Sequence, residues 1–239
     1  MSPQSIHAFA EKVALITDGT SRIGKAVALQ LALQGTFVIV GYSDTSAGEE
    51  RAIDELRSLG TLAGGVKADV STPDGAKSLV EAVNKTYGRL DLLVNCVRFL
   101  PEATFESTIE EVFTKIVDSN LRSAFFVTQA ALSLMKERPK PKIVNVISAC
   151  DTSETERNTA FSVANAGVAE LTRSLARSLP GNFRVNCVRV SEKSSGPAGA
   201  ENDLFLVDKG VPADDVARTV LYLLSGEAIG LNGQILTVE

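Results

Sequence analysis

Short apolar runs alternate along this chain with longer stretches in which apolar residues recur every three or four positions. A short apolar run is typical of a strand that is buried on both faces, whereas the longer repeat indicates an amphipathic helix. The runs predict strands at 12–17, 37–40, 90–94, 142–147, 183–188 and 234–238, with a further strand that ends at 68–70. The repeats predict helices at 23–33, 47–59, 109–135, 158–179 and 214–224, and another that begins at Pro73.

Strands that alternate with helices predict parallel βαβ units, hence an α/β fold with a doubly wound, Rossmann-type sheet of about seven strands flanked by helices on both faces. A chain of 239 residues can be built around one core, so residues 1–239 are expected to form a single domain. Ligands of such sheets bind beyond the carboxyl ends of the strands. One crevice is therefore expected to be lined by the loops that follow Thr17, Gly41, Asp69, Asn95, Ile147 and Val188.

Composition narrows the range of partners. The formal charge of −5 argues against nucleic acid and anionic membrane surfaces, which need clustered Lys and Arg. No apolar run is long enough to suggest a membrane span, and the polar start of the chain does not resemble a signal peptide, so a cytoplasmic location is expected. Small molecules and other protein subunits remain as partners.

Cysteine and histidine usage also excludes some chemistry. Cys96, Cys150 and Cys187 form no C-x-x-C pair, and each lies beside an apolar run, so buried free thiols are expected. The only histidine is His7, near the start of the chain. A histidine-based metal site and a Ser-His-Asp triad are therefore not expected, and no metal site is predicted.

The turn after the first predicted strand, residues 17–24, resembles the T-G-x-x-x-G-x-G turn of the short-chain dehydrogenase/reductase family, which holds the pyrophosphate of NAD(P) at a helix N-terminus. The last glycine is present as Gly24, while Asp18 and Arg22 replace the other two. Arginine at the second position is found in pteridine-reductase-like members, where it can meet the 2′-phosphate of NADP. The resemblance implies cofactor contacts from Thr17, Gly19, Arg22, Ile23 and Gly24.

Further cofactor positions follow from the same resemblance. Ser43 follows the second strand, where NAD-preferring members carry an acid, so NADP(H) is expected rather than NAD(H); the nearby Asp44 weakens that preference. The family's adenine-binding Asp is matched by Asp69, followed by Val70, and the first Asn of its N-N-A-G motif by Asn95. Residues 96–98 are bulkier than the rest of that motif and are expected to alter the adenosine cradle.

The family's catalytic positions are only half conserved. Asn120 matches its Asn and Ser148 the Ser that hydrogen-bonds a substrate carbonyl, but Phe161 replaces the Tyr and Asn165 the Lys. In the family the Tyr protonates the forming alkoxide, with a pKa lowered by the neighbouring ammonium. Phe161 has no proton to give and Asn165 carries no charge. The resemblance covers the whole chain and favours the branch of pteridine reductases and 3-oxoacyl-carrier-protein reductases.

Three functions remain open. The first is a catalytically impaired member of the family that keeps the fold. The second is an active NADPH-dependent carbonyl or pterin reductase in which Ser148 works with a water or with a loop acid from 151–156. The third is a non-catalytic partner subunit of an active homologue. Relatives commonly assemble as dimers or tetramers through their long helices, so a homodimer or homotetramer is expected. The long helix carries apolar residues that suit an interface or the core, with core expected for most: Phe113, Ile116, Val117, Phe125 and Phe126.

Overall fold

The computed structural model describes residues 9–43, 47–59, 62–101, 103–150, 159–192 and 211–239. Seven strands form one parallel sheet in the order β3-β2-β1-β4-β5-β6-β7, which confirms the predicted doubly wound fold. The strands are β1 (Val13–Thr17), β2 (Phe37–Tyr42), β3 (Ala63–Lys67), β4 (Leu92–Asn95), β5 (Lys142–Cys150), β6 (Arg184–Glu192) and β7 (Ile235–Val238).

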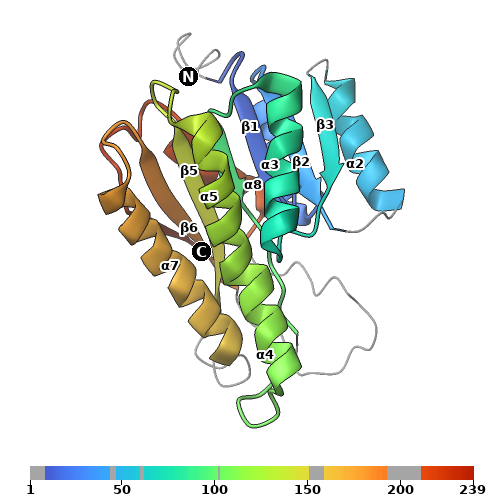
Figure 1. Cartoon of the computed structure of the whole chain (residues 1–239), viewed down its shortest axis with the longest axis vertical. Helices are drawn as coiled ribbons and strands as arrows, with labels where there is room; N and C mark the ends of the chain where they lie inside the picture. Colours follow the sequence, from blue (N-terminus) through green and yellow to red (C-terminus); the bar gives the residue numbers. More distant parts are fainter. Residues whose placement is uncertain (1–8, 44–46, 60–61, 102, 151–158, 193–210) are drawn as a thin grey trace.

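Helices cover both faces of this sheet. Figure 1 shows α3, α5 and α7 across one face, while α8 lies behind the sheet, where it packs against α1. No helix among the described residues is long and apolar enough to cross a membrane. The helices are α1 (Arg22–Ala32), α2 (Ala47–Ser58), α3 (Pro73–Tyr87), α4 (Glu110–Val117), α5 (Ser123–Met135), α7 (Thr159–Ser178) and α8 (Ala213–Leu224).

The core lies in two layers, one on each side of the sheet, because successive side chains of a strand point to opposite faces. In β1, Ala14 and Ile16 pack towards α1 and α8, whereas Val13 and Leu15 pack towards α3 and α5. All four side chains are fully buried. Each large aliphatic side chain buried in this way stabilises the fold by about 1.5–3 kcal/mol.

Several of the predicted strands end at other residues in the structure. The third strand ends at Lys67, and not at 68–70, because the Asp69 carboxylate accepts hydrogen bonds from the Ser71 N–H (3.1 Å) and hydroxyl (2.6 Å) and turns the chain into α3. Strands β5 and β6 pair as far as Cys150 and Glu192. The loop predicted to follow Val188 therefore begins as strand up to Glu192, and residues 193–210 lie outside the described residues.

The long helix predicted at 109–135 is interrupted. A π-helical segment at Asp118–Arg122 separates α4 from α5, and it contains Asn120. Single widened turns of this kind often occur at functional sites. Of the five apolar residues expected mainly in the core, only Ile116 is buried; the exposed fractions of Phe113 and Phe125 are 46% and 45%.

Two of the cysteines confirm the expectation of buried free thiols. Cys96 and Cys187 are buried and unpaired. Burial raises the pKa of the Cys187 thiol to about 12, and burial with the nearby Asp18 carboxylate also raises the pKa of Cys96. Both thiols are protonated at neutral pH, so neither is a reactive nucleophile.

The buried side chain of Lys142 is expected to make the free energy of unfolding depend on pH in the alkaline range. Its side chain is 3% exposed, its Nζ donates to the Ser225 carbonyl, and burial beside Lys12, Lys140 and Arg184 lowers its pKa from 10.5 to about 8. Between these two pH values the unfolded chain binds more protons than the folded chain, so this group makes the free energy of unfolding rise with pH.

We expect Lys142→Met to weaken that rise. Urea denaturation of both proteins at pH 8 and pH 10 measures the difference, because the other titrating groups are common to the two chains. An equal pH dependence in wild type and Lys142→Met would show that Lys142 does not titrate in this window.

Candidate active site

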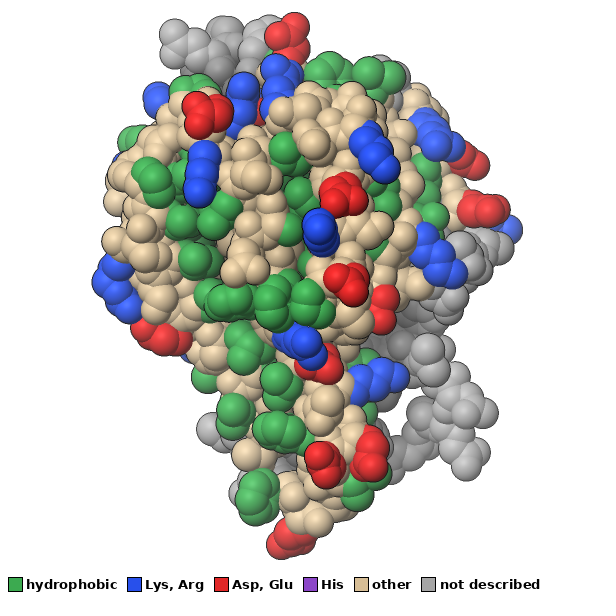
Figure 2. Space-filling model, viewed as in Figure 1, with side chains coloured by type: hydrophobic (Ala, Val, Ile, Leu, Met, Phe, Trp, Pro, Cys, Tyr) green, Lys and Arg blue, Asp and Glu red, His purple; other side chains and the backbone are tan. Residues whose placement is uncertain are grey.

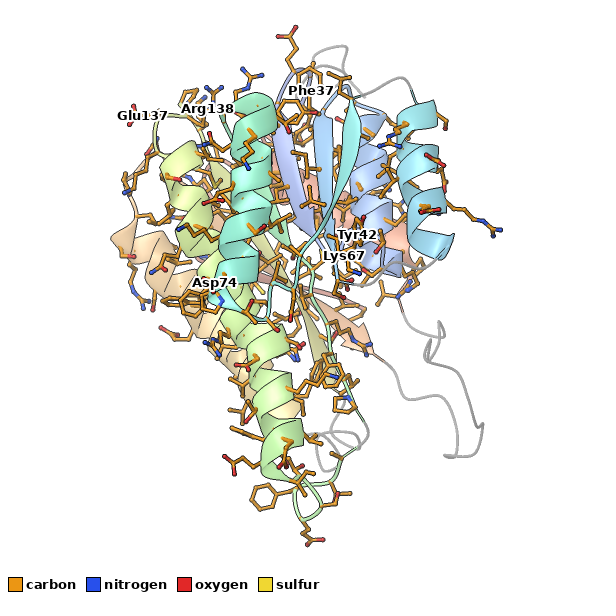
Figure 3. The ribbon with its side chains drawn as sticks, turned by 45° about the vertical axis from the view of Figure 1, so that its right-hand side comes forward. Phe37, Tyr42, Lys67, Asp74, Glu137 and Arg138 are labelled. Carbon is orange, nitrogen blue, oxygen red and sulfur yellow. The ribbon has the colours of Figure 1, made fainter. Side chains whose placement is uncertain are left out.

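The candidate site lies where the strands end at their carboxyl side. Figure 3 places Tyr42 and Lys67, which are partners in the β2–β3 register, at this end of the sheet, with Phe37 and Arg138 at the opposite end. The turn between β1 and α1 forms one wall of the site. Ser21 caps α1 by accepting a hydrogen bond from the Gly24 N–H (3.4 Å).

Two glycines let this turn pack closely. A Cβ on Gly19 would lie 2.5 Å from Val40 Cγ1, and one on Gly24 would lie 2.3 Å from the Asp18 carbonyl oxygen. Asp18 itself has a φ of 50°, in the left-handed region that aspartate tolerates better than most residues. Its carbonyl accepts from the Ser21 N–H (3.0 Å) and hydroxyl (2.7 Å). The turn therefore keeps a defined shape without the family's first glycine.

The first turn of α1 fits a pyrophosphate. The leading N–H groups of a helix, here including that of Ile23, have no intrahelical partner and favour an anion. Arg22 is exposed at the start of this helix, and its Nη1 donates to the Val211 carbonyl (3.2 Å). The buried Thr17 hydroxyl accepts from the Cys96 N–H (3.0 Å) and ties the ends of β1 and β4 together.

The residues that the resemblance assigns to adenosine binding follow β2 and β3. Ser43 and Asp69 are exposed after these strands, while Val70 is buried beneath them. The Asp69 carboxylate shapes the entry to α3, so its contacts in the structure do not depend on a ligand. Asp44 lies outside the described residues.

A buried polar network runs beneath the site. Asn95 Nδ2 donates to Thr128 Oγ1 (3.1 Å) and to Asn145 Oδ1 (2.8 Å), and Asn145 Nδ2 donates to Thr172 Oγ1 (2.9 Å). These bonds join β4 and β5 to helices α5 and α7. Asn95 Oδ1 is buried and accepts no hydrogen bond from the described protein atoms. The contacts place Asn95 in the scaffold that holds the strand ends in register.

Asn120 is fixed by backbone groups. Its Nδ2 donates to the carbonyls of Phe99 (2.8 Å) and Ile116 (2.9 Å), and its Oδ1 accepts from the Phe99 N–H (3.0 Å). The side chain is 5% exposed. Asn120 thus holds the segment after β4 against the π-helical turn.

The two replaced positions lie on α7 and are both buried. Phe161 is 1% exposed and packs with Ile116, Ala160 and Ala164. Asn165 Nδ2 donates to the Phe161 carbonyl (3.0 Å), four residues earlier in the same helix. The amide of Asn165, at the position of the family's Lys, therefore bonds to the backbone of its own helix. It does not extend into the crevice as the long side chain of a lysine would.

Arg98 contacts the first of these two positions, and the sequence did not identify it as part of this site. Its Nε donates to Ser148 Oγ (3.2 Å), and its Cζ lies 5.9 Å from the centre of the Phe161 ring. The sequence interpretation placed residues 96–98 in the adenosine cradle. The signal that could have found Arg98 is the strand order: β4 neighbours β5, so a long side chain just after Asn95 can reach Ser148.

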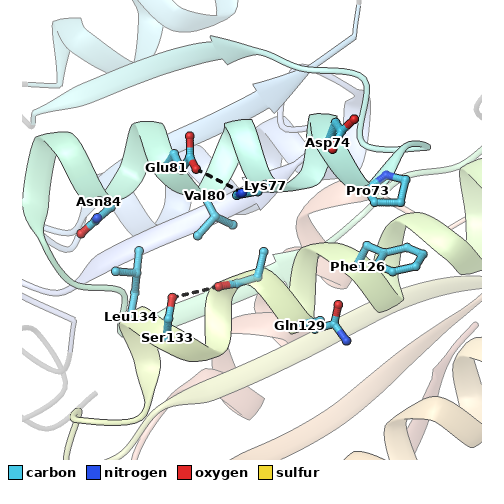
Figure 4. A pocket seen from close by; sticks show the side chains of 11 residues that line it. Pro73, Asp74, Lys77, Val80, Glu81, Asn84, Phe126, Gln129, Ser133 and Leu134 are labelled. Atoms are coloured by element: carbon cyan, nitrogen blue, oxygen red, sulfur yellow. Dashed lines mark hydrogen bonds and ion pairs between the residues drawn. The ribbon is translucent and has the colours of Figure 1, made fainter.

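A groove of about 410 Å³ lies elsewhere, between α3 and α5. Figure 4 shows that it runs along both helices, from Pro73 and Phe126 at one end to Asn84 and Leu134 at the other. Lys77 and Glu81 form an ion pair of 4.0 Å at its rim. None of the residues matched to cofactor or catalytic positions lines this groove, so we do not assign it to the site.

Comparison with known proteins agrees with this arrangement. The family model described as Enoyl-(Acyl carrier protein) reductase matches residues 19–239. An uncharacterised oxidoreductase of Methylorubrum extorquens is 32% identical, covering 95% of this chain and 96% of the relative. The 3-oxoacyl-[acyl-carrier-protein] reductase FabG of Thermotoga maritima is 30% identical, with the same coverage. The crystal structure of gox2181 matches with a TM-score of 0.83 at 28% identity, covering 98% of this chain and 96% of that one.

These matches define the class of protein. The chain belongs to the short-chain dehydrogenase/reductase family, a family of NAD(P)(H)-dependent oxidoreductases. In this chain Arg98 contacts both Ser148 and Phe161, two of the positions that the sequence resemblance matched to catalytic residues.

Proposed function

We propose that this protein binds NADP(H) in the family's crevice but is impaired in hydride transfer to carbonyl groups. The observation that carries the proposal is the pair of buried replacements on α7. Phe161 offers no acidic proton, and the Asn165 amide is bonded to the helix backbone. Loss of a general acid costs about 10²–10⁴ in rate. A shared fold does not establish a shared reaction, so the activity is inferred from the residues of the site.

The residues fit a cofactor better at its phosphates than at its reactive ring. The turn from Thr17 to Gly24 would hold the pyrophosphate, with Asp69 and Val70 beside the adenosine and Asn95 below the strand ends. Bound reduced nicotinamide would supply a hydride. At the receiving end Ser148 can hydrogen-bond an oxygen, and Asn120 holds the segment at Phe99. Phe161 and Asn165 supply no proton to that oxygen.

The proposal favours NADP(H) over NAD(H). Arg22 places a guanidinium at the exposed start of α1, and Ser43 follows β2 where NAD-preferring members have an acid. Lys67 adds a second exposed cation at the end of the neighbouring strand β3. A 2′-phosphate carries up to two negative charges, so these cations favour it electrostatically.

Calorimetric titration of the purified protein with NADPH and NADH tests this proposal. We expect saturable NADPH binding in the micromolar range, weaker NADH binding, and a smaller NADPH preference in Arg22→Gln, with no NADPH oxidation in the presence of carbonyls or pterins. Arg57→Gln, on the exposed surface of α2, is the matched control. Absence of NADPH binding at millimolar cofactor, or ready turnover by wild type, would refute the proposal.

One contact favours a second function, an active NADPH-dependent carbonyl reductase. The guanidinium of Arg98 beside Ser148 could stabilise a developing alkoxide while a water supplies the proton. The acids proposed for that role, Asp151, Glu154 and Glu156, lie outside the described residues. This alternative predicts turnover that Ser148→Ala abolishes, and turnover that survives the substitution would remove Ser148 from the mechanism.

We also propose that the chain assembles as a homodimer or homotetramer. Figure 2 shows hydrophobic side chains gathered over α5 and α4, where Phe113 and Phe125 are about half exposed. On α7, next to these helices, Val163 is 57% exposed. Buried in a subunit interface, such side chains would lose their contact with water. The same surface would suit an active homologue if the chain is a partner subunit.

A further inference from the structure

Three elements of the fold meet at Arg98. The residue follows the carboxyl end of β4, its Nε donates to Ser148 on β5, and its guanidinium lies over Phe161 on α7. Ser148 and Phe161 are 8% and 1% exposed, whereas Arg98 belongs to the exposed surface. A cation at the surface is thus held by a buried hydroxyl and a buried ring.

This geometry is suited to an anionic oxygen group. A guanidinium presents its N–H donors in a rigid plane, and its terminal nitrogens match the two oxygens of a carboxylate. Because Ser148 engages Nε, the orientation of the fork is partly fixed before a ligand arrives. Arg98 and Ser148 each take part in at least one further interaction, so a ligand would exchange with that interaction on binding.

The surroundings of Phe161 are apolar. Its ring packs with Ile116, Ala160 and Ala164, and half-buried Phe99 and Leu100 lie against the same cluster. A ligand whose charged end meets Arg98 therefore finds hydrophobic side chains beside the cation. Arginine stays protonated at any pH a protein tolerates, so it can bind an oxyanion but cannot serve as a proton donor.

We propose that Arg98 is the ligand-anchoring residue of this site, and that the ligand it selects is a carboxylate with an apolar body rather than a neutral carbonyl compound. The inference rests on the proposed function, because a site that does not reduce its ligand can select one that has no reducible carbonyl group. It extends that function by naming the chemical class of the ligand and the residue that recognises it.

Calorimetric titration with benzoate, with benzamide as its neutral counterpart, tests the proposal on the cofactor-free protein. We expect wild type to bind benzoate about tenfold or more tightly than benzamide, since a charge-assisted hydrogen bond contributes that difference. Arg98→Gln should lower the benzoate affinity about tenfold or more and leave benzamide unchanged. Arg98→Lys should recover part of the loss, and Arg57→Gln should bind as wild type does.

Three outcomes would overturn the anchor role: no benzoate binding by wild type, equal binding of benzoate and benzamide, or an unchanged benzoate affinity in Arg98→Gln. The exposed position of Arg98 means that folding should not depend on it, and circular dichroism checks this. NADPH oxidation with benzaldehyde is measured separately. Oxidation of NADPH with benzaldehyde would refute the proposed impaired function, whatever the benzoate affinity is. Absence of benzoate binding without such turnover would refute only the role of Arg98 as the ligand anchor.

Discussion

The double substitution Phe161→Tyr and Asn165→Lys is expected to raise the rate of NADPH oxidation with a carbonyl substrate by about 10²-fold or more over wild type. The tyrosine would supply the missing proton, and the lysine, one turn later on α7, would lower the pKa of that phenol. Both positions lie on the buried face of α7, and Phe161 lies under the guanidinium of Arg98, which bonds to Ser148. Spectrophotometric assay with acetoacetyl thioester or benzaldehyde measures the gain.

A matched control separates chemistry from the mere addition of a tyrosine. Val163 lies on the outer face of the same helix and is 57% exposed, so Val163→Tyr combined with Asn165→Lys adds the same groups in the wrong place. We expect no gain from that pair. An equal gain in both double variants, or none in either, would contradict the assignment of the defect to positions 161 and 165.

Asp91→Ala is expected to lower the free energy of unfolding by about 3 kcal/mol. The Asp91 side chain is 10% exposed, its Oδ1 accepts from Arg138 Nε (2.7 Å), and its Oδ2 accepts from the Val13 N–H (3.0 Å). The carboxylate therefore joins the start of β1 to the segment after α5. Truncation leaves a buried N–H without its acceptor and Arg138 without its partner.

Urea denaturation measures this loss, with Asp54→Ala as the control. Asp54 also pairs with an arginine, Arg57 (3.3 Å), but its side chain is 74% exposed. Exposed ion pairs of this kind contribute about 0–1 kcal/mol. If the two substitutions cost the same, the amino end of the sheet does not depend on the buried carboxylate.

The fold could be predicted from sequence because strands and helices differ so clearly in their apolar periodicity. The runs at β1 and β4 are apolar up to their last residues, Thr17 and Asn95, as expected of parallel strands covered on both faces. The predicted strand ends are wrong where a strand continues through polar residues beyond its apolar run. The apolar pattern stops near Ser148 on β5 and Ser191 on β6, yet the ladder continues, with Ser148 opposite Val190 and Ser191 opposite Ala149.

The interrupted helix shows a different kind of error. The apolar repeat from Ile109 to Met135 is continuous enough to predict one helix, but the side chain of Asn120 bonds to the backbone of Phe99 on the segment after β4. Such a long-range contact leaves no trace in local periodicity. It explains why the sequence could place Asn120 near the site but not the widened turn that holds it.

The resemblance could predict which residues belong to the candidate site, but it could not predict which side chains contact one another there. The resemblance matched Ser148, Phe161 and Asn165, and in the structure Arg98 contacts both Ser148 and Phe161. It assigned Arg98 to the adenosine side because motif spacing gives no side-chain direction. The sequence showed only that Asp18 replaces the family's first glycine, whereas the structure shows its left-handed backbone supporting the turn through the Asp18 carbonyl.

The central claim, that this crevice binds a reduced cofactor without using it, is tested most directly by a single-turnover experiment. Wild-type protein in excess over NADPH is mixed rapidly with a saturating carbonyl compound, while nucleotide fluorescence and absorbance are followed together. We predict a fluorescence change that reports bound NADPH and an absorbance that stays constant. A loss of reduced-nicotinamide absorbance at the rate of the Phe161→Tyr, Asn165→Lys variant would contradict the claim.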